Sequence, residues 1–377
     1  MLSRAAAVPK TLVLNRAPER RKDDMDTIFA SYPFQRLFVS PGYGYMDGDE
    51  DEDETMFVLP NQLLEHLAEL HLRLDKPRAM FPHDAKLPNL QRLSIHSLWE
   101  PDFQRCSPAI PWSQIRHLTL SRPTVETHLL FGVLKQCVRL EYCKIEYPRV
   151  FHRTAIPFHN ITLPNLLSLE LSTFDPAKED FFDLHPVEGH IFRIECMQRL
   201  IIPSVNVLQL SLWNLDTSVY SRIIEQSGGM PRLHTLTLRD QTADIGILLK
   251  LLPHLESLTV SRDLGSGIWQ DLSTGRLGPR LKHITCPICA AVDVLLDSLK
   301  IRYQNAVRSS TTQQHCQPQI THFQSATFVL SCDRSKFQDM MRDALESNGR
   351  HPYQCLQWAF EENSDRTYTL DNIECLI

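Results

Sequence analysis

A short apolar pattern recurs along this 377-residue chain at nearly constant spacing. LPNLQRLSIHS at 87–97 returns 76 residues later as LPNLLSLELST at 163–173. Both segments contain L-x-x-L-x-L, where L is any apolar residue. Successive copies are 22 to 28 residues apart, except for one step of 39. Nine copies share this phase, with middle apolar residues Leu70, Leu93, Leu118, Cys143, Leu169, Leu208, Leu236, Leu258 and Ile284.

The alternation within each copy predicts a short β-strand with its apolar residues on one face. The interleaved residues then point to the opposite face, and most are polar: Ser94, Thr119, Lys144, Glu170, Gln209, Thr237 and Thr259. Several return segments show apolar residues at helical spacing, and they cover 124–137, 216–228, 242–252 and 290–306. For the second of these we expect Asp216 or Thr217 as N-cap and Gly228 just past the end.

A strand–helix unit of 20–29 residues is the repeat of leucine-rich-repeat proteins. We therefore predict an α/β fold, a leucine-rich-repeat solenoid (horseshoe) with a parallel sheet on the concave face and irregular helices on the convex face. Degenerate repeats with an acidic loop at 46–54 are expected within 1–60, and the solenoid within 61–306. A polar loop at 307–319 then leads to a C-terminal capping repeat at 320–377, with strand candidates at 323–330 and 355–360 and a helix candidate at 335–347.

Two patterns resemble metal sites. Cys286 and Cys289, with His283 upstream and His315-Cys316 downstream, suggest zinc, but the two cysteines also fit the strand and turn positions of a repeat. Asp47–Glu54 begins like a calcium loop, but Val58 stands where an EF-hand needs a bidentate Glu. We therefore expect no metal and no cofactor.

No nucleophile elbow, P-loop or dinucleotide fingerprint occurs, so we do not expect an enzyme. The net charge of −6 does not favour nucleic-acid binding. No apolar run reaches the roughly 18 residues of a membrane span.

Ten unevenly spaced cysteines favour a reducing compartment, cytoplasmic or nuclear. The Arg-rich stretch 1–22 leaves a mitochondrial transit peptide as an alternative.

The repeats resemble those of fungal F-box/leucine-rich-repeat proteins. The similarity is carried by SRAAAVPKTLVL (3–14), PWSQIRHLTLSRP (111–123), the LPNL starts at 87 and 163, and LRDQTADIGILLKLLPHLESLTV (238–260). The resemblance implies the substrate-binding part of a ubiquitin-ligase subunit, with the F-box itself missing. We expect the F-box, and with it binding to the ligase adaptor, only if coding sequence continues upstream of Met1.

The predicted function is therefore non-enzymatic protein recognition on the concave face. A truncated gene model of a full F-box adaptor of a cullin-type ubiquitin ligase is an alternative. A GTPase-regulating or catalytic protein on the same fold is an alternative of another class. Aromatic and arginine side chains are frequent in interface hot spots. On that basis we predict the partner-binding residues Arg73, His96, Trp99, Arg122, Tyr147, Trp213, Arg239 and Arg262.

Overall fold

The structure is a computed structural model in which two compact units, 1–202 and 203–377, are described separately. The residues that it describes are 10–14, 33–39, 57–59, 61–73, 79–81, 85–96, 104, 107–146, 149–151, 160–172, 198–211, 215–239, 242–288, 292–311, 320–330, 334–360 and 368–369.

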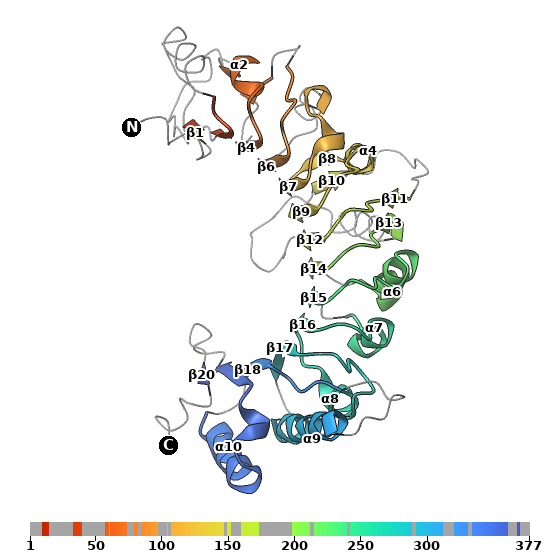
Figure 1. Ribbon diagram of the computed structural model, residues 1–377, viewed down its shortest axis with the longest axis vertical. Helices are drawn as coiled ribbons and strands as arrows, with labels where there is room; N and C mark the ends of the chain where they lie inside the picture. The colour runs from red at the N-terminus through yellow and green to blue at the C-terminus, as the bar shows by residue number, and fades with distance from the viewer. Residues whose placement is uncertain are drawn as a thin grey trace. The chain divides into compact units, whose positions relative to one another are not determined.

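Seven parallel strands form the sheet of the first unit, and their order in the sheet follows the chain (Figure 1). In each pair of neighbours from β4 to β12, the middle apolar residues of the repeats stand opposite one another, as Leu70 does with Leu93. These side chains are buried, so one face of the sheet is apolar core. The strands are β1 (Thr11–Leu14), β2 (Arg36–Val39), β4 (Glu69–Arg73), β6 (Arg92–His96), β7 (His117–Ser121), β9 (Tyr142–Glu146) and β12 (Ser168–Ser172).

Short, varied segments return the chain between these strands. Within the described ranges, the helices bounded here are α2 (Asn61–Leu64) and α4 (Thr127–Gln136), with 3-10 turns η2 (Ser107–Ala109) and η3 (Trp112–Gln114). Three small parallel pairs also lie in these segments: β3 (Phe57–Val58) with β5 (Ala79–Met80), β8 (Thr124–Glu126) with β10 (Arg149–Phe151), and β11 (Ile161–Thr162) with β13 (Leu200–Ile201).

The second unit has six parallel strands, followed by one short antiparallel strand. A helix follows nearly every strand, as Figure 1 shows for α6 to α9. The strands are β14 (Val207–Ser211), β15 (Thr235–Leu238), β16 (Ser257–Val260), β17 (His283–Ile288), β18 (Ser325–Leu330), β19 (Leu356–Phe360) and the antiparallel β20 (Tyr368–Thr369). The helices are α6 (Thr217–Gln226), α7 (Ile245–Leu251), α8 (Gly265–Thr274), α9 (Val292–Thr311) and α10 (Arg334–Asn348), with the 3-10 turn η4 (His351–Tyr353).

One hydrogen-bond pattern repeats where the strands begin. The first strand residue and the residue before it both donate their N–H to one carbonyl of the preceding repeat. Ala68 and Glu69 share Gln35 O in this way, at 2.9 and 3.0 Å, and Glu256 and Ser257 share His234 O, at 3.0 and 2.8 Å. Because the same turn recurs, each strand starts in register with the one before it.

All nine strands predicted from the repeat are confirmed as parallel strands, and so are the later strands β18 and β19. The predicted helix near the C-terminus is confirmed as α10. Asp216 is the N-cap of α6 and accepts a hydrogen bond from Ser218 N at 2.9 Å; Gly228, at φ +70°, follows the helix end as predicted.

Three details differ from the predictions. The segment 124–137 begins as strand β8 because Thr124–Glu126 pair with β10, and only the remainder is helical. Helix α9 continues to Thr311, into the predicted polar loop. Helix α8 was not predicted, because its three N-terminal residues, Gly265-Ser-Gly267, look like a turn; burial of Trp269 and Leu272 accounts for it.

Candidate functional site

Both units expose the side of the sheet opposite the apolar core. In the first unit the outward residues form three rows across the strands, because neighbouring strands are in register. The first row is Arg36, Glu69, Arg92, His117, Tyr142 and Ser168. The middle row is Phe38, His71, Ser94, Thr119, Lys144 and Glu170. The last row is Arg73, His96, Ser121, Glu146 and Ser172.

Glu69 joins two neighbouring strands of this face. Its Oε2 lies 3.0 Å from Nε of Arg36, and its Oε1 lies 2.8 Å from Nε2 of His71. The His71 ring stacks on the Phe38 ring, with centroids 4.1 Å apart and planes 7° apart. Both carboxylate oxygens of Glu69 are therefore engaged inside the protein.

Lys144 holds a second cluster farther along the sheet. Its Nζ lies 2.7 Å from Oε1 of Glu146 and 3.0 Å from Oε1 of Glu170. Ser121 Oγ donates to Oε2 of Glu146 at 2.7 Å, and Tyr142 Oη donates to Oε2 of Glu170 at 3.4 Å. One ammonium group thus serves two carboxylates from neighbouring strands.

The pKa values in this cluster reflect the pairing. Partial burial alone would lower the pKa of Lys144, but hydrogen bonds to Glu146 and Glu170 outweigh burial, so the pKa lies above its ordinary value. Burial would raise the pKa of Glu146, but hydrogen bonds from Lys144 and Ser121 outweigh it and lower that pKa. Lys144 and Glu146 are therefore both ionised at neutral pH.

Two neighbouring rings on this face are neutral at pH 7. Burial and the charge of Arg92 lower the pKa of His117 below 6.5. Burial and the charge of Glu170 raise the pKa of Tyr142 above 10. The two rings lie side by side, with centroids 6.0 Å apart.

The corresponding middle row of the second unit carries no charge. Neighbouring strands again place its members opposite one another. Thr327 Oγ1 donates to Oε1 of Gln357 at 3.3 Å, which links the last two strands of the row. The row consists of Gln209, Thr237, Thr259, Thr285, Thr327 and Gln357.

Five of the eight predicted partner-binding residues lie in the described part of the chain. Arg73 and His96 face each other across β4 and β6 in the last row, and the exposed Arg122 follows β7 at φ +53°. In the second unit, Arg239 is exposed after β15 and Arg262 is half-buried after β16. Trp99, Tyr147 and Trp213 lie outside the described residues. The structure thus places these arginines and His96 at carboxyl ends of strands, and their binding role stays a prediction.

Most charged side chains on the exposed face of the first unit were not among the predicted partner-binding residues. Arg36 and Glu69 belong to its first row, and Lys144 and Glu170 form an ion pair between neighbouring strands. The alternation L-x-L marked Lys144 and Glu170 as outward residues. No signal in the sequence showed that they contact each other.

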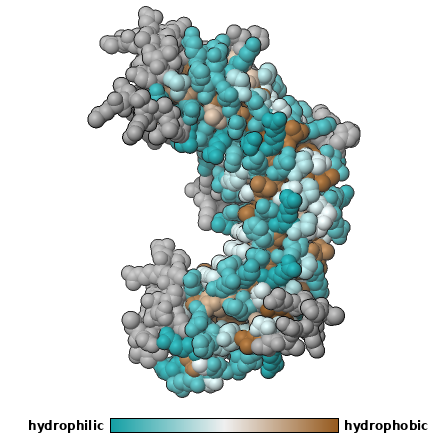
Figure 2. Space-filling model, in the orientation of Figure 1, coloured by the Kyte–Doolittle hydropathy of each residue, from teal (hydrophilic) through white to brown (hydrophobic). Residues whose placement is uncertain are grey.

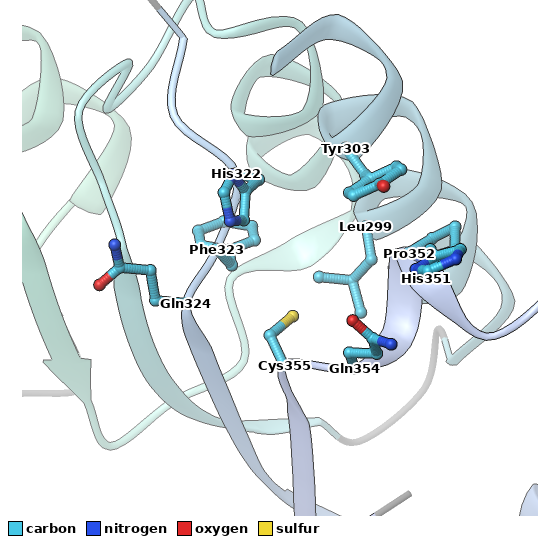
Figure 3. Close-up of a pocket in the computed structure, with 9 residues that line it drawn as sticks. All are labelled: Leu299, Tyr303, His322, Phe323, Gln324, His351, Pro352, Gln354 and Cys355. Carbon is cyan, nitrogen blue, oxygen red and sulfur yellow. The ribbon is translucent and has the colours of Figure 1, made fainter. Parts of the chain in front are cut away.

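The second unit also contains a hollow of about 220 Å³ between α9, the segment before β18, and η4 with the residues after it (Figure 3). Its walls include the rings of Tyr303 and His322, whose centroids are 6.4 Å apart, and the thiol of Cys355. Burial raises the pKa of Cys355 to about 11, so this thiol is protonated at neutral pH and is a poor nucleophile.

Among the residues that the structure describes, no three His, Cys, Asp or Glu side chains gather as metal ligands would. Cys286 is buried in the core, and this burial raises the pKa of its thiol, in line with a strand position of the repeat. Cys289, His315, Cys316 and the acidic loop lie outside the described residues.

The visible surface is mainly hydrophilic, and its hydrophobic residues form small separate areas (Figure 2). The large exposed apolar side chains include Val13, Val138, Leu167, Ile247, Ile301 and Val307, which belong to several different elements. No helix within the described ranges has the length and apolar character needed to span a bilayer.

Comparison of the sequence with known proteins found no matching family model and no matching curated protein.

Proposed function

We propose that this chain is a non-enzymatic leucine-rich-repeat scaffold that recognises another protein through the exposed faces of its parallel strands. We also propose that its repeats form a horseshoe-shaped solenoid. Its role would be like that of the substrate-binding part of an F-box protein. A cytoplasmic or nuclear location would suit that role. The bound protein would then be a candidate for ubiquitination.

The observation that carries the proposal is the alignment of outward side chains across successive strands. In the first unit, the middle row runs in register from Phe38 on β2 to Glu170 on β12. A row of this kind offers many polar contacts at the roughly 4.8 Å strand spacing. Repeat proteins use such extended surfaces for binding.

A photo-crosslinking amino acid placed on the sheet face tests this proposal. Thr119 and Thr259 report on the two faces, and the exposed Lys135 on α4 and Lys250 on α7 serve as controls on the helices. We expect discrete protein adducts in cells from the face positions and not from the helix positions. Equal labelling at both kinds of position, or none at the face, would overturn the proposal.

A further inference from the structure

Charge is distributed unevenly over the exposed face of the first unit. On the described face residues of β2 and its neighbours β4 and β6, the guanidinium groups of Arg36 and Arg92 accompany the carboxylate of Glu69, whose two oxygens are already engaged by Arg36 and His71. Arg92 is exposed, and its charge contributes to the lowered pKa of His117 on the next strand. This side of the face therefore has an excess of positive charge.

The opposite charge dominates on β9 and β12. Here the described face residues include two carboxylates, Glu146 and Glu170, and one ammonium group, Lys144, which is shared between them. The hydroxyls of Ser121 and Tyr142 complete their hydrogen bonds without adding positive charge. This side therefore has an excess of one negative charge.

Strand β7 separates the two sides with uncharged groups. Its outward residues are His117, whose pKa is lowered, together with Thr119 and Ser121. From β6 to β12 there are three strand spacings, or roughly 14 Å. An extended peptide covers that distance with about four residues.

We propose that this face binds an extended protein segment that lies across the strands and carries an acidic block and a basic block about four residues apart. The acidic block would lie over Arg36 and Arg92, and the basic block over Glu146 and Glu170. Charge complementarity of this kind selects partners and register, because a misplaced block meets like charges. This inference rests on the proposed protein-recognition function and names the chemistry of the segment recognised.

Two fluorescent peptides of identical composition test the inference by anisotropy with the full chain. One has three Asp, four Ser and three Lys in that order, and the other has the same residues with the two charges alternating. We expect the block peptide to bind about tenfold more tightly at low salt, and this preference to vanish near 0.5 M salt. Equal binding of the two peptides, or failure of the block peptide to bind, would overturn the inference.

Variants identify the surface that binds. We expect Arg92→Glu to weaken the block peptide about tenfold and Glu170→Gln about threefold. Arg139→Glu changes the same charge on an exposed turn residue outside the strands, and it should leave binding unchanged. Because Glu170 contacts Lys144, thermal unfolding checks the fold of its variant, and Arg92→Glu decides the matter if that fold is lost.

These experiments distinguish failure of the two-block segment from failure of the proposed protein-recognition function. If Thr119 still crosslinks a cellular protein and Arg92→Glu changes neither that adduct nor peptide binding, the scaffold proposal stands and the two-block segment is wrong.

Discussion

Each unit is built on a ladder of parallel strands, but the two units differ in where they place polar groups. The first unit has ion pairs across its exposed face, as between Lys144 and Glu170. In the second unit the middle row is threonine and glutamine, while Arg302 is fully buried. All four buried polar side chains among the described residues, Ser227, Ser273, Ser298 and Arg302, belong to the second unit. The same repeat thus allows charge to be used either for an exposed surface or for internal support.

Arg302 shows how a buried charge can be satisfied without a carboxylate. Its guanidinium donates to backbone carbonyls of Leu272, Gly278, Leu281 and Thr321 at 2.5 to 3.0 Å, and more weakly to that of Pro279 at 3.3 Å. It also stacks on Phe323 at 4.4 Å from the ring centroid. Burial lowers its pKa to about 10, so it remains charged at pH 7. Arg302, which lies on α9, therefore connects the segments that lead into β17 and β18.

The largest predicted effect tests this internal support. Arg302→Met should lower the free energy of unfolding by about 3–5 kcal/mol, because several buried carbonyls lose their donor. Urea denaturation followed by circular dichroism measures the loss. Arg280→Met, at an exposed position, should change stability by less than about 0.5 kcal/mol. Equal effects of the two variants would show that Arg302 does not support the second unit.

The apolar ladder should matter equally in both units. Leu236→Ala in the second unit and Leu118→Ala in the first should each cost about 2–5 kcal/mol, because both side chains are buried. Leu167→Ala, at a 40% exposed position, is the matched control. The same denaturation experiment applies. A change below about 0.5 kcal/mol for Leu236 would contradict the register of the repeat.

The ion pairs of the first unit predict a dependence on pH. Glu146 has a folded-state pKa below its ordinary 4.5, so its contribution is present above that pH and is lost as the pH falls through the folded value. Glu146→Gln should destabilise by about 0.5–1 kcal/mol at pH 7, since the pair is partly exposed. The difference from wild type should shrink below pH 4.5 in a pH series of unfolding midpoints. A constant difference would show that ionisation of Glu146 is not involved.

The smallest change in stability is expected from a substitution in the uncharged middle row of the second unit. Thr259→Val keeps the shape of the side chain on an exposed sheet face and should change stability by less than about 0.5 kcal/mol at any pH. Thermal unfolding between pH 4 and pH 8 tests this. A loss above about 1 kcal/mol, or a pH dependence like that of Glu146→Gln, would remove the contrast between the two units.

Periodicity predicted the strands well because each must bury the same two apolar positions. Leu70 and Ile284 lie in different units, yet both were predicted from the same phase and both are buried. The return segments were predicted less well, since any short segment that covers the apolar face satisfies the repeat. This is why β8 pairs with β10 where a helix was expected, and why α8 forms although it begins at a glycine and was not predicted.

The candidate site was predicted only in outline. Alternation shows that Lys144 and Glu170 point outward, but it does not show that they meet, because their contact depends on the pairing of strands 26 residues apart. Arg302 lies in a helical pattern that includes polar residues, and its carbonyl partners carry no sequence signal. Backbone acceptors exist at every residue, so only the folded chain selects them.

The sequence by itself determined which residues face the core and that the strands recur about every 25 residues, because burial imposes a local period on the chain. The tertiary structure alone decided which outward side chains become neighbours, which segments return as strands or helices, and which charge is enclosed. Those outcomes depend on distances between residues far apart in the chain, and a local pattern carries no information about them.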